Sequence, residues 1–240
     1  MRHTTDGLIY RTSDKLIVDE VPGVYGNVPV APKDVVLDLG GHIGIAARLF
    51  LAKGAARVIS VEADPANIPL LRRNLHPLRK RSIIIPAAVG ASPGRMPFYT
   101  RPDRGYVGSI LADPDRRKLM VPVVPFSGLL KTYRPSIVKS DIEFSEYELP
   151  EFRFLPDFVR VVAMEVHIRF IGIFSGRTMD ADELRERREA AADLMAGMEA
   201  QGFREHWRKD KQAKVGEPRA AEDRSGLGPM TKCVCVTWVR

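Results

Sequence analysis

The sequence predicts an α/β fold with a seven-stranded, mostly parallel β-sheet, helices on both faces and an antiparallel final strand. Near-continuous apolar runs at residues 35–39, 57–61 and 82–85 are typical of parallel strands that are buried on both faces. Segments with helical spacing of apolar residues separate these strands, which is the alternation of a parallel α/β sheet. The last two strands, expected at 203–207 and 233–239, are joined by a polar segment without a helical pattern, so we expect them to form a hairpin.

The chain is long enough to bury one hydrophobic core. It has 240 residues, of which 45% are hydrophobic, and one domain is the default at that length. Residues 1–32 are broken by several glycines and prolines, and we interpret them as edge strands or a lid in front of a main domain that spans residues 33–240. The sequence leaves the oligomeric state open.

Membrane and secretion signals are missing from the sequence. It contains no apolar run of about 18 residues, the length that crosses a membrane. The N-terminus lacks the apolar region of a secretion signal. We therefore expect a cytoplasmic protein without membrane contacts, in which Cys233 and Cys235 are reduced packing residues.

The central feature is a strand that leads into a glycine-rich turn and then into a helix. The strand expected at 34–39 is followed by Gly40, Gly41 and Gly44, which permit a tight turn and close approach of a ligand to the backbone. The helix that follows directs its N-terminal N–H groups at the same place. Asp38, at the tip of the strand, is expected at the mouth of this binding site.

Glu62 indicates the class of ligand. It ends the strand at 57–61, and an acidic residue about 20 positions beyond such a turn accepts hydrogen bonds from the ribose hydroxyls of a nucleoside. His42 stands where a pyrophosphate-binding turn has its middle glycine, and Asp38 would repel phosphate. A nucleoside that carries an amine therefore fits better than a dinucleotide. An ordinary solvent-facing glutamate is the alternative interpretation of Glu62.

The rest of the chain alternates between further helices and strands. A helix opens at Asp64–Pro65, although Pro69 indicates a separate turn at its start, and a second helix spans 180–201. The other expected elements are buried strands at 136–140 and 158–164, edge strands at 96–99 and 120–124, and loops at 105–109 and 209–230.

Acidic residues and one histidine follow the fourth and fifth strands. Asp141 and Glu143 come after the fourth strand, and Glu165 and His167 come after the fifth. Because the carboxyl ends of parallel strands meet at one edge of a sheet, we expect these side chains to converge beside the glycine turn. Such groups can abstract a proton or bind a metal. For each of them, a structural hydrogen-bonding role is the alternative.

These motifs, in this order, resemble the FkbM-type family of class I S-adenosylmethionine-dependent methyltransferases, which have a Rossmann-like fold. The stretches that carry the resemblance are residues 38–44, 61–65, 87–90, 121–124 with 129–130, 138–143 and 164–167. The chain departs from the family pattern at Phe144, where glycine is usual, and at 126–128, where an acidic residue is usual. The first departure changes the acceptor pocket, and neither touches the methyl-donor site.

The resemblance implies S-adenosylmethionine as the methyl donor and a hydroxyl of a small molecule or sugar-containing metabolite as the acceptor. The residues expected to bind the methyl donor are Asp38, Gly40, Gly41, His42, Gly44, Glu62, Ala63, Ala88 and Ser109.

Methyl transfer to a hydroxyl requires alignment of the acceptor oxygen and a group that takes up its proton. We expect Asp141 and His167 to supply that base, with Glu143 and Glu165 orienting the acceptor. In the alternative mechanism, Asp141, Glu165 and His167 hold a divalent ion that lowers the pKa of the hydroxyl.

Two other functions stay open at the level of sequence. The formal net charge of +7, with basic clusters at 72–73, 79–81, 116–118 and 204–214, permits a nucleic acid or nucleotide-linked acceptor. Few aromatic residues accompany these clusters, and a solvated basic surface is the favoured explanation of them. Residues 140–143 also lack the Asn/Asp-Pro-Pro-aromatic pattern that grips an exocyclic amine. The last alternative is a scaffold that binds the methyl donor without catalysis, which has no need of the strand-end acids.

Overall fold

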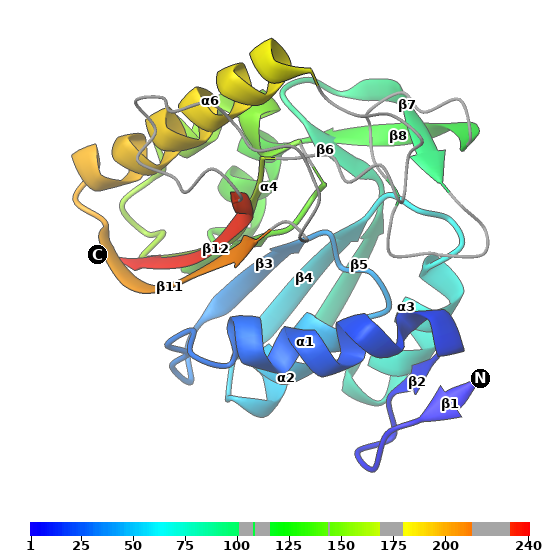
Figure 1. Ribbon diagram of the computed structural model, residues 1–240. Coiled ribbons are helices and arrows are strands. Elements are labelled where there is room, and N and C mark those ends of the chain that lie inside the picture. Colours follow the sequence, from blue (N-terminus) through cyan, green and yellow to red (C-terminus); the bar gives the residue numbers. More distant parts are fainter. Residues whose placement is uncertain (101–107, 109–115, 144, 169–179, 213–230) are drawn as a thin grey trace.

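The fold centres on one large β-sheet. The computed structural model describes residues 1–100, 108, 116–143, 145–168, 180–212 and 231–240. The strands of this sheet are β3 (Val35–Leu39), β4 (Arg57–Glu62), β5 (Ser82–Pro86), β9 (Ile137–Ser140), β10 (Val161–His167), β11 (Arg204–Gln212) and β12 (Thr231–Val239). Among the described residues, this sheet has seven strands in the order β11-β12-β10-β9-β3-β4-β5. Figure 1 labels β3, β4 and β5 side by side, with β11 next to β12.

Strand directions confirm the predicted topology. The five strands from β10 to β5 pair in parallel, and β12 is antiparallel to both of its neighbours, β10 and β11. The strand order reverses between β3 and β9, because the chain runs from β3 to β4 and β5 on one side and later adds β9 and β10 on the other. In open α/β sheets, ligands bind beyond the carboxyl ends of the strands at such a switch point.

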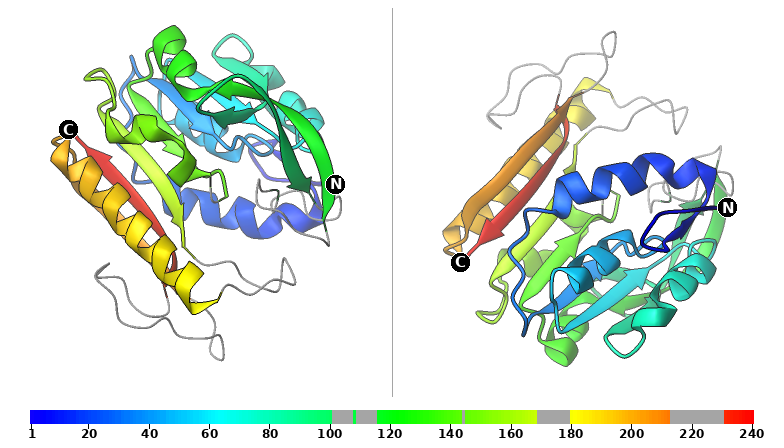
Figure 2. Two further views of the ribbon diagram at one scale, coloured as in Figure 1. Left: turned by 90° about the horizontal axis from the view of Figure 1, so that it is seen from above. Right: turned by 90° about the horizontal axis from the view of Figure 1, so that it is seen from below.

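Helices cover both faces of the sheet (Figure 2). The first face carries α1 (Lys15–Tyr25), α2 (Ile45–Ala52) and α3 (Ile68–Leu75), and the second carries α4 (Phe126–Tyr133) and α6 (Ala181–Ala200). Successive residues of β3 point to opposite faces, so Val36 packs with the first group of helices while Leu37 and Leu39 pack with the second. Burial on both faces explains why the parallel strands read as continuous apolar runs.

A smaller sheet lies beside the main one. It contains β6 (Ala88–Gly90), β8 (Arg117–Pro125) and β7 (Gly94–Thr100), in that order. The edge strands predicted at 96–99 and 120–124 are therefore confirmed as strands, and they pair with each other antiparallel in this separate sheet. In the described part of the chain, none of the helices combines the length and the apolarity needed to cross a membrane.

The structure of residues 1–32 differs from the sequence-based interpretation. Residues 16–18, expected as part of an edge strand, lie in helix α1, and only β1 (Arg2–His3) and β2 (Ile9–Tyr10) form a small strand pair. The spacing of Val21, Val24 and Tyr25 places them on one helical face, where they are buried against the sheet and α2. The division of the chain at residues 1–32 and 33–240 stays a prediction.

Three element boundaries also differ from the prediction. The fifth strand is shifted to 161–167, because its pairing with β12 continues through Glu165 and His167, which therefore lie inside the strand near its carboxyl end. Residues 209–212, expected in a loop, extend β11 by pairing with β12, and the rest of that loop lies outside the described residues. Helix α3 begins at Ile68 rather than at Asp64, with the separate turn that Pro69 indicated.

Candidate active site

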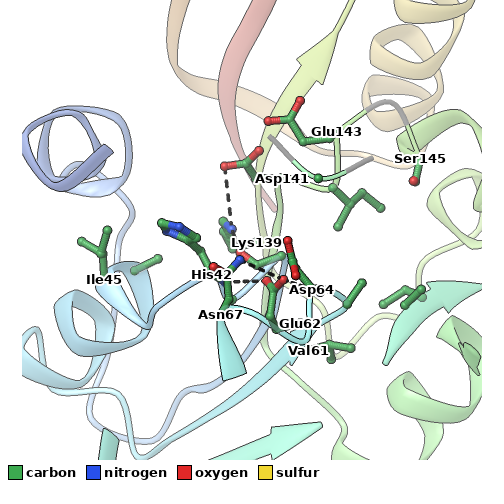
Figure 3. A pocket seen from close by; sticks show the side chains of 18 of the residues that line it. His42, Ile45, Val61, Glu62, Asp64, Asn67, Lys139, Asp141, Glu143 and Ser145 are labelled. Atoms are coloured by element: carbon green, nitrogen blue, oxygen red, sulfur yellow. Dashed lines mark hydrogen bonds and ion pairs between the residues drawn. The ribbon is translucent and has the colours of Figure 1, made fainter. Parts of the chain in front are cut away.

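An open cavity lies at the carboxyl ends of β3, β4 and β9 (Figure 3). The empty space within it, counted together with the solvent at its open mouth, is about 950 Å³. The glycine turn after β3, the end of β4, the start of β6 and the end of β9 form its walls, and helix α1 contributes Ile17, Val21 and Tyr25. The cavity thus occupies the switch point of the sheet.

The glycine turn has the backbone conformation that its sequence predicts. Gly40 and Gly44 have φ angles of 78° and 91°, in the left-handed region that favours glycine. A Cβ atom on Gly40 would lie 1.9 Å from the carbonyl oxygen of Asp141, and one on Gly41 would lie 2.9 Å from Cβ of Ser60. The absence of a Cβ therefore lets the turn pack tightly against the end of β9 and against β4, and both glycines line the cavity.

Asp38 lies beneath the turn, not at the mouth of the cavity as predicted. It is fully buried, and its carboxylate accepts a hydrogen bond from Ser60 Oγ at 3.0 Å and lies 3.2 Å from Lys139 Nζ. Burial raises the pKa of Asp38, and the ammonium group of Lys139 opposes that rise. Sequence analysis missed Lys139, although a lysine within an otherwise apolar buried strand was a visible signal.

Glu62 connects two turns at the wall of the cavity. Its Oε2 accepts a hydrogen bond from the backbone N–H of His42 at 2.7 Å, and its Oε1 accepts one from the backbone N–H of Asp64 at 2.7 Å and one from Asn67 Nδ2 at 3.3 Å. Burial raises the pKa of Glu62, and these donors together with His42 oppose that rise. The carboxylate is therefore held rigidly at the edge of the site.

Apart from Asp38, the residues predicted to bind the methyl donor divide into three groups. Those that line the cavity are Gly40, Gly41, His42, Glu62, Ala63 and Ala88. Gly44 instead packs against α3, where an added Cβ would lie 3.1 Å from Leu71 Cδ1. Ser109 lies outside the described residues, although its neighbour Gly108 lines the cavity.

A polar clamp, formed by Arg11, Asp14, His42 and Asn67, ties the N-terminal segment to the glycine turn. Arg11 Nε donates to Asp14 at 2.9 Å and Arg11 Nη2 donates to Asn67 Oδ1 at 2.6 Å, while His42 Nε2 lies 3.6 Å from Asp14 Oδ1. Burial alone would raise the pKa of Asp14, but hydrogen bonds from His42 and Arg11 outweigh it and lower the pKa to about 2. Sequence reasoning missed this clamp, because its members are far apart in the chain.

The substitution Asp14→Asn is expected to lower the free energy of unfolding at pH 7 by about 2–3 kcal/mol, because the native state loses a carboxylate that it stabilises in charged form. The folded pKa lies below the unfolded value, so the stabilisation is complete above about pH 4 and is lost as the pH falls toward 2. Denaturant unfolding of both proteins should therefore show a difference that shrinks over this interval. The matched control is Asp19→Asn on the exposed face of α1, where a change of less than about 0.5 kcal/mol is expected. A constant difference between pH 7 and pH 2 would contradict the assignment.

The predicted convergence of the strand-end groups is confirmed. In the acid–histidine cluster, formed by Asp141, Glu143, Glu146, Glu165 and His167, the imidazole is surrounded by carboxylates. His167 Nε2 lies 3.9 Å from Asp141, 3.6 Å from Glu143 and 3.6 Å from Glu165. On the other side of the ring, His167 Nδ1 lies 2.9 Å from Glu146 Oε1. Asp141 and Glu143 face the cavity (Figure 3).

The carboxylates determine the charge on the histidine. Burial alone would lower the pKa of His167, but Glu143, Glu146 and Glu165 outweigh it and raise the pKa well above its ordinary value. These carboxylates therefore favour the imidazolium form of the ring. Burial, together with Asp141, Glu165 and Glu146, raises the pKa of Glu143 to about 7, against the opposing effect of His167.

Glu165 has further partners besides His167. Lys211 Nζ donates to its two oxygens at 2.8 and 2.9 Å, and the Cys233 thiol lies 3.2 Å from Oε1. Burial alone would raise the pKa of Glu165, but His167 and Lys211 outweigh it and lower the pKa to about 2. Cys233 and Cys235 are buried free thiols on the same face of β12, as predicted.

The three residues predicted as alternative metal ligands, Asp141, Glu165 and His167, are not equally available to a metal ion. The ammonium group of Lys211 already occupies both oxygens of Glu165. Asp141, Glu143 and His167 place one ligand atom each within 4.8 Å of one another. The imidazolium of His167 supplies positive charge among these carboxylates.

Comparison with known proteins identifies solved structures that are similar to this chain. No family model and no curated protein sequence matches the chain. Among solved structures, the methyltransferase FkbM from Methylobacillus flagellatus is 15% identical, with a TM-score of 0.50 over 88% of this chain and 45% of that protein. An rRNA methylase from Streptococcus thermophilus is 9% identical, with a TM-score of 0.48 over 97% of this chain and 98% of that one. The C-terminal domain of precorrin-6Y C5,15-methyltransferase from Rhodobacter capsulatus is 12% identical, with a TM-score of 0.47 over 98% of this chain and 91% of that one.

These likenesses concern the fold alone. The chain spans less than half the length of the FkbM protein that it matches. The mostly parallel seven-stranded sheet of the described residues is the part of the fold to which that comparison applies. The chain has the fold of the class I S-adenosylmethionine-dependent methyltransferases, among which FkbM is a structural relative.

Proposed function

We propose that this protein binds S-adenosylmethionine and transfers its methyl group to a hydroxyl of a small-molecule or sugar-containing acceptor. The observation that carries the proposal is that one cavity joins the glycine turn and Glu62 to the carboxylates of Asp141 and Glu143. The first pair of features suits a nucleoside, and the second suits an acceptor that must lose a proton.

The residues present fit the methyl donor. Gly40 and Gly41 line the cavity, and a glycine backbone without a Cβ permits close approach of a ligand. A carboxylate has about four acceptor positions, so Glu62, which already accepts three hydrogen bonds, retains about one position, on Oε2, for a ribose hydroxyl. Ala63 and Ala88 leave room for a flat adenine ring. When bound, the methyl donor supplies a methyl group already activated by its sulfonium.

The acceptor end of the cavity has two unlike walls. Asp141 and Glu143 lie on one side, and Ile17 and Val21 of helix α1 lie on the other. Apolar side chains of α1 that line the same cavity as the carboxylates favour a small acceptor over a folded nucleic acid. An acceptor with an apolar part against α1 and a hydroxyl toward the acids matches this arrangement.

Glu143 is the group that we assign to accept the acceptor's proton. Its pKa of about 7 matches the operating pH of a general base in neutral solution. His167, expected from the sequence to act as a base, is held as an imidazolium by its carboxylate neighbours and cannot take up a further proton. Its role is to stabilise the carboxylate form of Glu143, and Asp141 orients the acceptor hydroxyl.

The test measures binding and transfer separately. Isothermal titration calorimetry with S-adenosylhomocysteine should show binding, and labelled methyl donor should transfer its methyl group to members of a panel of hydroxylated metabolites and sugars. For an accepted substrate, kcat/KM should rise as the pH increases through about 7, because the base works in its deprotonated form. Addition of EDTA should leave the rate unchanged, which distinguishes this mechanism from the metal-dependent one. Failure to bind S-adenosylhomocysteine, or transfer only to RNA or DNA in a parallel panel, would reject the proposal.

A further inference from the structure

Lys139 is a charged side chain in a place where an apolar one would be expected. It lies on β9 directly after Ile137 and Val138, which are fully buried, and only 2% of its own surface is exposed. Removing an ammonium group from water costs several kcal/mol, and a buried ion pair is often no more stabilising than apolar residues of the same volume. Packing of the sheet alone therefore does not account for this lysine.

On one side, Lys139 holds the glycine turn. Its Nζ donates hydrogen bonds to the carbonyl oxygens of Leu39 at 3.1 Å and Gly40 at 2.8 Å, and it lies 3.2 Å from Asp38 Oδ1. Asp38 is the direct neighbour of Lys139 across the parallel pair of β3 and β9. Burial alone would lower the pKa of Lys139, but Asp38 and Asp141 outweigh it and raise the pKa, so the side chain is an ammonium ion.

On the other side, Lys139 faces the acceptor acids. Its Nζ lies 3.9 Å from Asp141 Oδ2, the oxygen that also accepts a hydrogen bond from Tyr25 Oη at 3.4 Å. The same ammonium lies 5.5 Å from the centre of the Tyr25 ring. The backbone N–H of Asp141 donates at 3.1 Å to the carbonyl oxygen of Leu39, which Lys139 also contacts. Figure 3 shows Lys139 between the turn and Asp141.

We propose that Lys139 is a positioning residue that couples the glycine turn of the methyl-donor site to the acceptor-side carboxylate of Asp141. This inference rests on the proposed function and adds a specific role within it. One ammonium group contacts both the glycine turn and Asp141, so the positions of these two parts of the site depend on each other. The tight approach of Gly40 to the Asp141 carbonyl leaves little freedom for one to move alone.

The test replaces the buried pair without leaving an unpaired charge. Lys139→Met alone would leave the buried carboxylate of Asp38 without its positively charged partner. The informative variant is therefore Asp38→Asn combined with Lys139→Met. This double variant should keep a cooperative thermal transition, while its affinity for S-adenosylhomocysteine and its kcat at saturating methyl donor each fall by about tenfold or more. A merely structural pair would shift the transition temperature and leave both of those quantities unchanged. The matched control is Lys53→Met, whose ammonium group caps a carbonyl of Gly26 away from the cavity.

A second variant keeps the inference testable if the double variant does not fold. Asp38→Asn alone removes one carboxylate beneath the turn, so the ammonium of Lys139 is drawn toward Asp141 and away from the turn. Its affinity for S-adenosylhomocysteine should fall by about fivefold or more, although Asp38 lies beneath the cavity wall. Affinities within twofold of the wild type in a folded variant would overturn the role of Lys139. If the wild type itself fails to bind S-adenosylhomocysteine, the proposed function fails, and that outcome is distinct from either of these.

Discussion

Replacing Glu143 by glutamine is expected to lower kcat by about 10²–10⁴-fold, the usual contribution of a general base, while binding of S-adenosylhomocysteine stays unchanged. Glutamine keeps the size and polarity of the side chain but cannot accept a proton at neutral pH. The effect is expected to be large because His167 and Glu165 are already committed to each other and to their own partners. Steady-state kinetics with an accepted hydroxyl substrate measures kcat, and calorimetry measures the binding of S-adenosylhomocysteine.

Matched variants separate proton transfer from general disturbance of the site. Glu186→Gln changes an exposed glutamate on α6 and should leave kcat unchanged. Asp141→Asn and His167→Ala should also abolish transfer while leaving methyl-donor binding measurable, because the first removes the orienting carboxylate and the second removes the imidazolium beside Glu143. Turnover at the wild-type rate in Glu143→Gln would reject the assignment of the base.

Substitution of Gly40 by alanine is expected to abolish binding of S-adenosylhomocysteine and to lower the free energy of unfolding by about 2–5 kcal/mol. The left-handed backbone conformation costs an alanine about 1–2 kcal/mol, and overpacking against the end of β9 adds about 1–3 kcal/mol. The added Cβ would lie 1.9 Å from the Asp141 carbonyl oxygen, so either the turn or Asp141 must move. Calorimetry and denaturant unfolding measure the two effects.

Gly54→Ala is the control for backbone strain alone. Gly54 ends helix α2 with a φ angle of 105°, and nothing lies within 4 Å of an added Cβ. This variant should lose about 1–2 kcal/mol of stability and bind S-adenosylhomocysteine as tightly as the wild type. Equal losses of binding in both glycine variants would show that global destabilisation, not the turn, causes the defect.

The sequence predicted the scaffold of the site and its chemically active groups. The apolar runs, the helical spacing and the glycine turn depend on local rules, because a buried strand, an amphipathic helix and a positive φ angle each restrict the residues within a few positions. The topology of parallel strands then implied that Asp141, Glu143, Glu165 and His167 converge. The failure at residues 16–18 was also local, since a short apolar run fits a strand or a helix until its burial is known.

The roles of these groups depend on contacts between distant parts of the chain, which only the tertiary structure decides. The Asp38 carboxylate is buried because Lys139 from another strand lies beside it, and Glu165 is neutralised by Lys211 from the edge hairpin. The charge of His167 follows from carboxylates on three separate elements. Patterns of neighbouring residues determine secondary structure, whereas burial and the distances between charges determine pKa values, and both of these quantities exist only once the chain has folded.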